Sequence, residues 1–161
     1  MGNSGCAQFA LRIATTTRSQ PVSPQEGVLF IQADISTLEG ANTVAEHLNS
    51  EWGGLDILVN NVGGTETKPG GFEVLTDEDW NNILNVNLLG AVRLNRAFLP
   101  GMLERKSGTI IHICSVSHLL PFTNSTLAYA ASKAALRLAS AESRLRHSAN
   151  VRFARSFGHG A

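Results

Sequence analysis

The residues that most clearly suggest chemistry are a tyrosine and a lysine four positions apart, Tyr129 and Lys133, in an alanine-rich segment. Helical spacing places such residues on one face, so both side chains can act on one molecule. A phenol titrates near pH ~10, and a nearby ammonium favours the phenolate form, which suits it to proton transfer near neutrality. Ser115 follows the apolar run 109–114, and its hydroxyl can hydrogen-bond an oxygen that the tyrosine also touches. The combination predicts general acid–base chemistry.

Strand-like and helix-like segments alternate around these residues. Thr76 with Asp79, and Ser36 with Glu39, have the spacing of a capping box at a helix start, and the glycine pair 53–54 is typical of a helix end. Apolar β-branched runs are typical of strands. The sequence predicts strands at 9–17, 28–33, 56–60, 109–114 and 151–154, and helices at 36–51, 76–99 and 126–147.

This alternation predicts right-handed βαβ crossovers, and therefore an α/β fold with a Rossmann-like, doubly wound parallel sheet covered on both sides. The apolar run 56–60 is typical of a strand buried on both faces, and Leu38 is expected on the inner face of its helix. Pro100 is expected to bend or end the helix that contains it. The 161 residues are predicted to form a single domain, 1–161.

Polar and glycine residues follow three of the predicted strands at the point where each one ends. They are Asp34, the segment 60–64 and Ser115. In a parallel sheet the ligand binds at the carboxyl ends of the strands, so these features are expected to converge on one edge. Glycine lets the backbone approach a ligand closely, although a plain turn between strand and helix has the same composition.

Composition excludes several classes of partner. Thirteen basic residues balance thirteen acidic ones, so no net field favours nucleic acid or a membrane surface. No apolar run approaches the ~20 residues that span a bilayer, and the start of the chain has no secretory-signal pattern, which predicts a cytoplasmic protein. The two cysteines, Cys6 and Cys114, indicate neither a disulfide framework nor a metal site.

These residues together resemble the short-chain dehydrogenase/reductase family, which comprises NAD(P)-dependent oxidoreductases built on a Rossmann-type sheet. The resemblance covers about residues 27–140 and rests on motifs that occur in the family's order. They are an aspartate after a strand (Asp34), a strand end similar to Asn-Asn-Ala-Gly (60–63), a tryptophan seven residues before an asparagine (Trp80 and Asn87), Ser115, and Tyr129 with Lys133.

The resemblance implies hydride transfer between a nicotinamide and a small carbonyl or alcohol substrate. Tyr129 would act as general acid or base, Lys133 would assist it and bind the nicotinamide ribose, and Ser115 would hold the substrate oxygen. Asn87 would connect Lys133 to solvent through a water. Ser115 lies fourteen residues before Tyr129, where thirteen is common in the family, so Ser117 is the alternative.

The resemblance also implies a cofactor site for NADP or NAD. Asp34 would contact the adenine, and Asn60 and Gly63 would line the adenosine side. Arg18 resembles the arginine that pairs with the 2′-phosphate of NADP, which favours NADP, although an ordinary surface arginine fits the sequence equally well. The expected cofactor-binding residues are Arg18, Asp34, Ile35, Asn60, Val62, Gly63, Tyr129 and Lys133.

Both ends of the sequence depart from the family, so the predicted domain is partial. The family's first strand, with its glycine-rich turn, has no counterpart before Arg18, and the substrate-covering segment has none after 151; residues 1–9 and 152–161 are atypical. The missing strand predicts either a gap in the sheet or a gap filled by the N-terminal segment. The alternative function is a catalytically inactive fragment that acts by association. Homo-oligomers are expected through the helices containing Asn87 and Tyr129.

Overall fold

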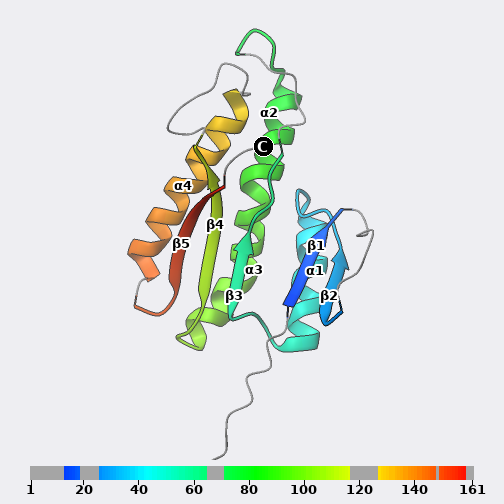
Figure 1. The fold of residues 1–161 in the computed structure, drawn as a ribbon, viewed down its shortest axis with the longest axis vertical. Coiled ribbons are helices and arrows are strands. Elements are labelled where there is room, and N and C mark those ends of the chain that lie inside the picture. Colours follow the sequence, from blue (N-terminus) through cyan, green and yellow to red (C-terminus); the bar gives the residue numbers. More distant parts are fainter. Residues whose placement is uncertain (1–12, 19–25, 65–70, 117–126, 148, 159–161) are drawn as a thin grey trace, which may run out of the picture.

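The computed structural model describes residues 13–18, 26–64, 71–116, 127–147 and 149–158 (Figure 1). From β2 onward strands and helices alternate along the chain, as the sequence predicts, whereas no described helix lies between β1 and β2. The prediction of an incomplete Rossmann-like α/β fold is confirmed. The elements are β1 (Ile13–Thr17), β2 (Val28–Gln32), α1 (Leu38–Trp52), β3 (Ile57–Asn60), α2 (Asp77–Leu84), the π-helical turn η1 (Asn85–Leu89), α3 (Gly90–Glu104), β4 (Thr109–Ser115), α4 (Leu127–His147) and β5 (Arg152–Gly158).

The strands form two parallel sheets rather than one. β1 pairs with β2, starting with Ile13 opposite Val28, while β3, β4 and β5 form a second sheet in that order. Among the described strands none lies between β1 and β3, so the described part of the sheet has the gap that was one of the two expected outcomes. β5 pairs with β4 along its whole length up to Gly158, so it is longer than the predicted 151–154.

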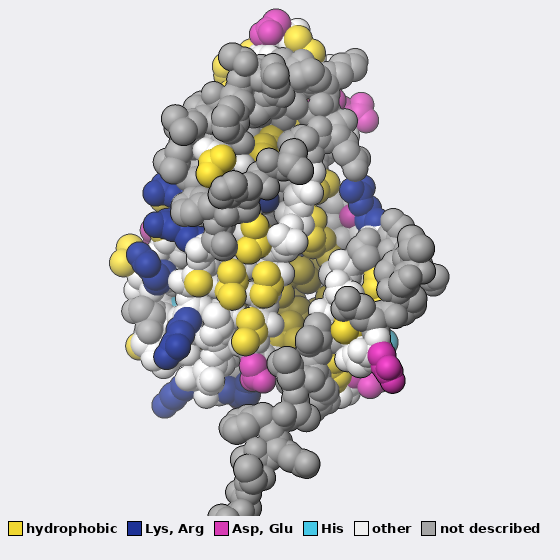
Figure 2. All heavy atoms as spheres, in the orientation of Figure 1, with side chains coloured by type: hydrophobic (Ala, Val, Ile, Leu, Met, Phe, Trp, Pro, Cys, Tyr) yellow, Lys and Arg dark blue, Asp and Glu magenta, His cyan; other side chains and the backbone are white. Residues whose placement is uncertain are grey.

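Helices α1, α3 and α4 lie behind the two sheets, whose opposite face carries no described helix, and α2 lies beyond the carboxyl ends of the strands (Figure 1). The core between helices and strands contains Leu58 and Ile110 from the sheet and Phe98 from α3. On the open face Ile57 and Val59 are 57% and 51% exposed, and hydrophobic side chains gather there (Figure 2). The expectation that β3 is buried on both faces is therefore wrong for the described residues, because one face has no helix and one edge has no neighbouring strand.

Helix α1 begins one residue later than its predicted capping box. The cap is Thr37, whose Oγ1 accepts the N–H of Gly40 at 3.0 Å, and not Ser36, whose N–H donates to Asp34 instead. This shift places Leu38 in the first turn at 54% exposure rather than on the inner face. The predicted glycine stop is present, because Gly53 ends α1 at φ 72°, a left-handed conformation that suits glycine.

The long helix predicted for 76–99 differs from the observed segment in two ways. Its capping box is present, with the N–H of Asp79 donating to Thr76 Oγ1 and the Asp79 carboxylate accepting from the N–H of Thr76. The helix then widens into η1 before α3 begins. α3 also continues past Pro100 to Glu104, because Pro100 and the residue four before it, Arg96, are exposed, and water can reach the carbonyl that loses its partner.

Candidate functional site

Lys133 connects α4 to the carboxyl ends of two strands. Its side chain is 4% exposed, and its Nζ donates to the carbonyl oxygens of Val62 and Ile113, both at 3.3 Å. Val62 follows β3, and Ile113 lies near the end of β4. A buried ammonium therefore lies at the edge of the sheet where parallel α/β proteins bind their ligands.

Gly63 makes a close backbone approach to this ammonium. A Cβ at Gly63 would lie 2.9 Å from Lys133 Nζ and 3.1 Å from Asn87 Oδ1, so a larger residue would displace one of the two side chains. Asn87 in turn fixes the next residue, because its Oδ1 accepts the N–H of Gly64 at 3.1 Å and its Nδ2 donates to the Gly64 carbonyl at 3.0 Å. Gly63, Asn87 and Lys133 therefore form one cluster.

The π-helical turn η1 carries Asn87 into this cluster. Asn87 is 1% exposed, and its Nδ2 also donates to the carbonyl of Ile83 one turn earlier. Single π-helical turns inside α-helices occur often at functional sites. The sequence, read as one continuous helix, contained no signal for this turn.

Tyr129 and Lys133 project from the same side of α4, as their spacing predicts. Lys133 Nζ lies 5.8 Å from the centroid of the Tyr129 ring, within the range of a cation–π contact. The tyrosine is half-buried against Leu75, Ile83 and Ala128, which hold the ring in place. Tyrosine and lysine therefore face one common space.

Ser115 is the last residue of β4, two positions beyond the carbonyl that Lys133 contacts, and it is 3% exposed. Its backbone pairs in register with Gly158 of β5, which fixes its position at the strand end. The alternative serine, Ser117, lies outside the described residues.

Burial changes the charge properties of this cluster. It lowers the pKa of Lys133 from the usual 10.5, against a smaller opposing effect of Cys114. Burial raises the pKa of the neighbouring Cys114 thiol, although the positive charges of Lys133, Arg155 and Arg137 partly offset the change. The cysteine is a free, buried thiol. A lysine with a lowered pKa releases its proton more easily than an exposed one.

The six expected cofactor residues outside α4 line one cleft of about 680 Å³ between β1 and β3. Its volume falls in the range of roughly 300–1,000 Å³ common for ligand sites. Burial would raise the pKa of Asp34, but hydrogen bonds from Ser36 and the charge of Arg18 outweigh it and lower this pKa below 3.8. These residues are Arg18, Asp34, Ile35, Asn60, Val62 and Gly63.

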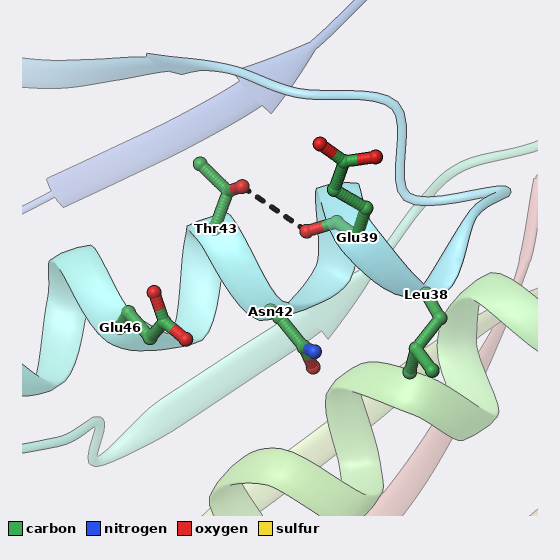
Figure 3. A pocket seen from close by; sticks show the side chains of 5 residues that line it. All are labelled: Leu38, Glu39, Asn42, Thr43 and Glu46. Atoms are coloured by element: carbon green, nitrogen blue, oxygen red, sulfur yellow. Dashed lines mark hydrogen bonds between the residues drawn. The ribbon is translucent and has the colours of Figure 1, made fainter.

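A second hollow lies on the outer side of α1 and does not resemble a site. Its lining comes from α1 alone, and the Thr43 hydroxyl donates to the carbonyl of Glu39 within the helix (Figure 3). No three histidine, cysteine, aspartate or glutamate side chains in the described segments are grouped so that they could hold a metal ion.

A buried polar chain next to the site was not predicted from the sequence. Asn60 Nδ2 donates to Asn95 Oδ1 at 2.9 Å, and Asn95 Nδ2 lies 2.9 Å from His112 Nε2. Arg93, also on α3, donates to the carbonyl of Ser36. The sequence contained one signal for this chain, which is the histidine within the apolar run 109–114. A buried imidazole needs a hydrogen-bond partner, so this position indicates a polar neighbour in the core.

The architecture and the site define a class of protein before any comparison is made. Parallel strands with crossover helices, a glycine-rich strand end and a cleft at the carboxyl edge are features of Rossmann-like nucleotide-binding proteins. No helix in the described ranges is long and apolar enough to cross a membrane.

Comparison with known proteins identifies the family. The family model described as short chain dehydrogenase matches residues 4–154, and the chain belongs to this family. The chain is 42% identical over 104 residues to the uncharacterized oxidoreductase YvrD of Bacillus subtilis, covering 65% of this chain and 38% of that protein. It is 38% identical to the short chain dehydrogenase pigC of Monascus ruber, covering 83% and 43%.

Solved structures agree with this assignment. L-sorbose reductase from Gluconobacter frateurii, solved with NADPH and L-sorbose, is 34% identical with a TM-score of 0.70, covering 80% of this chain and 48% of that one. The chain therefore spans less than half of the length of the relatives described here.

Proposed function

We propose that this chain is an NAD(P)-dependent oxidoreductase acting on a small carbonyl or alcohol substrate. The observation that carries the proposal is the cluster in which Lys133, buried on α4, contacts Val62 and Ile113 at the ends of two strands and packs against Gly63 and Asn87. Tyr129 lies on the same helix face. Membership of the short chain dehydrogenase family supports this function over the alternative of a catalytically inactive, associating fragment.

In this proposal each side chain has a distinct task. Tyr129 donates a proton to the substrate oxygen during reduction and takes one up during oxidation. Lys133 places a positive charge beside the phenol, and Ser115 donates a hydrogen bond to the oxygen on which negative charge develops. Asn87 keeps the backbone of Gly64 in place beside Lys133. The nicotinamide cofactor, when bound, would supply or accept the hydride.

The residues of the cleft fit the nucleoside part of such a cofactor. The Oγ1 of Thr16 and the Oδ1 of Asn60 are buried and have no hydrogen-bond partner in the described structure, and both residues line the cleft. Gly63 leaves space that a Cβ would fill. Asp34 and Arg18 supply a carboxylate and a guanidinium at the carboxyl edge, the latter suited to a 2′-phosphate.

Direct titration with cofactor tests the proposal. NADPH fluorescence should change saturably at micromolar concentration, and reduction of a panel of small aldehydes and ketones should consume NADPH. No fluorescence change at millimolar cofactor would rule out the proposed oxidoreductase.

The proposed location is the cytoplasm, and the free thiol of Cys114 is compatible with this reducing compartment.

Replacing Arg18 by alanine should weaken NADPH binding by about tenfold or more, because a hydrogen bond to a charged group contributes roughly 1.5–3 kcal/mol. NADH lacks the 2′-phosphate, so its affinity should change little. Dissociation constants of both cofactors, measured on the wild type and on Arg18→Ala, decide the point. Equal weakening of NADPH and NADH binding would show that Arg18 does not bind the 2′-phosphate.

We also propose that copies of the chain associate through α4 and η1. Leu138 and Leu145 are 69% and 78% exposed and lie two helical turns apart on one face of α4. Exposed apolar side chains on one face are typical of a protein–protein interface. Leu89 in η1 is 37% exposed. The double variant Leu138→Arg with Leu145→Arg should shift an oligomer to monomer in sedimentation velocity, with a dissociation constant raised by about tenfold or more.

The matched control for association is Leu38→Arg on α1, an equally apolar position that is 54% exposed. This variant should sediment like the wild type. An interface that contributes more than roughly 5–6 kcal/mol of binding free energy would keep the protein associated at about 100 μM. A wild type that is monomeric at this concentration would therefore contradict the association.

A further inference from the structure

Arg93, in the first turn of α3, joins two segments that are far apart in sequence. Its Nη1 donates to the carbonyl of Ser36 at 2.9 Å, and its Nη2 donates to Asn85 Oδ1 at 2.9 Å. Ser36 follows β2 and lies 57 positions from Arg93, whereas Asn85 begins η1. A guanidinium is a planar fork with fixed donor directions, so two acceptors bound at once fix its orientation. The side chain therefore holds the segment after β2 at a set position relative to η1.

The backbone of Ser36 connects Arg93 to Asp34. The carbonyl of Ser36 accepts from Arg93, and the N–H of Ser36 donates to Asp34 Oδ1 at 2.9 Å. The segment 34–36 lines the cleft, whereas Arg93 is not among the described residues that line it. Arg93 therefore reaches a ligand in the cleft through this segment and not by direct contact.

The start of α3 packs directly against the same segment. A Cβ at Gly90 would lie 3.2 Å from the backbone oxygen of Ile35, so the helix leaves little space there. Of the described side chains, Arg93 is the one that donates to the Ser36 carbonyl. Hydrogen bonds from a charged donor are stronger than those between neutral groups. Arg93 is therefore the side chain that fixes the residue whose N–H orients the Asp34 carboxylate.

We propose that Arg93 is a positioning residue for the cofactor, which through Ser36 orients the Asp34 carboxylate toward the amino group of the adenine base. A carboxylate can accept about four hydrogen bonds, and the Ser36 N–H takes one of these positions, so Asp34 can still accept from a ligand. A base with a carbonyl in place of the amino group puts an acceptor opposite the carboxylate. Arg93 thereby contributes to the choice of base without touching it. This inference rests on the proposed oxidoreductase function, because it requires the adenine to lie at Asp34.

Titration with NADPH and with its hypoxanthine analogue, in which a carbonyl replaces the adenine amino group, tests this role. The wild type should bind NADPH about tenfold or more tightly than the analogue in a fluorescence titration. Arg93→Met keeps a long side chain but removes both donors, and it should reduce this preference to less than about threefold. The loss should come from weaker NADPH binding, because the analogue makes no hydrogen bond that depends on the orientation of Asp34.

Two further variants separate the proposed route from a general effect on the fold. The double variant Arg93→Met with Asp34→Ala should show the same preference as Asp34→Ala alone, because Arg93 acts through Asp34. Arg96→Met makes the same chemical change at an exposed position of α3 and should match the wild type with both ligands. In the cofactor-free protein, Arg93→Met should speed hydrogen exchange at the Ser36 amide by about tenfold or more.

Arg93→Lys keeps the protein testable if Arg93→Met does not fold. Its ammonium can donate to Ser36 but lacks the fork that also binds Asn85, so the preference for NADPH should fall by about threefold. A wild type without a preference for NADPH, an unchanged preference in the Arg93 variants, or equal weakening of both ligands would overturn the proposal. No binding of NADPH to the wild type at millimolar concentration would instead overturn the proposed oxidoreductase function, and this inference with it.

Discussion

Replacing Tyr129 by phenylalanine is expected to lower kcat by about 10²–10⁴-fold while the dissociation constant of NADPH changes by less than about threefold. The change removes one hydroxyl, and with it the group proposed to transfer the proton, but it keeps the ring that packs against Leu75, Ile83 and Ala128. Tyr129 is the only tyrosine in the chain, so no second phenol can substitute for it. Steady-state turnover and NADPH fluorescence titration measure the two quantities separately.

Thermal unfolding provides the control for this variant. The midpoints of Tyr129→Phe and of the wild type should agree within about 2 °C, which would show that lost turnover is not lost folding. Phe72→Leu, which changes an 81% exposed aromatic ring that stacks on Trp80, should leave kcat unchanged. A fall in cofactor affinity as large as the fall in kcat would contradict the assigned role of the phenol.

The order of strands and helices could be predicted because it depends on local signals. Apolar periodicity, the capping box of Thr76 with Asp79 and the glycine stop at Gly53 each act within one or two helical turns. The exposure of β3 could not be predicted from its own residues. An apolar strand has the same residue pattern whether or not a helix and a neighbouring strand cover it. The π-helical turn η1 likewise carries Asn87, whose hydrogen bond to the Gly64 carbonyl joins residues far apart in sequence.

In the candidate site, too, some features could be predicted from local sequence patterns and others could not. The common face of Tyr129 and Lys133 follows from a helical repeat, and the shared edge of Asp34, Asn60 and Gly63 follows from the topology of a parallel sheet. The contacts that fix Lys133, by contrast, join residues 20 and 71 positions apart in sequence. Such contacts depend on how the layers pack, which no local pattern encodes.

His112 is the clearest case of a residue whose role depends on packing. It is 1% exposed, and burial, with a smaller effect of the Lys133 charge, lowers its pKa from 6.5 to about 4. Asn60 donates to Asn95 Oδ1, which leaves Asn95 Nδ2 to donate to His112 Nε2. The neutral ring therefore carries its proton on Nδ1, and a second proton on Nε2 would break the hydrogen bond from Asn95.

The neutral form of His112 should make folding depend on pH. The folded pKa lies below the unfolded one, so this contribution is complete above about pH 6.5 and is lost as the pH falls toward 4. Between about pH 7.5 and pH 5 the free energy of unfolding should fall by about 2 kcal/mol on account of this residue. Urea unfolding of the wild type and of His112→Asn, each at both pH values, measures this loss.

The decisive quantity is the difference in pH dependence between wild type and His112→Asn, because other titrating groups contribute equally to both. The variant loses packing against Phe153, on which the imidazole stacks at 6.5 Å, so it should be less stable at every pH. Its stability should nevertheless decline less on acidification, by the same ~2 kcal/mol. Parallel declines in the two proteins would mean that His112 is protonated as readily in the folded chain as in the unfolded one.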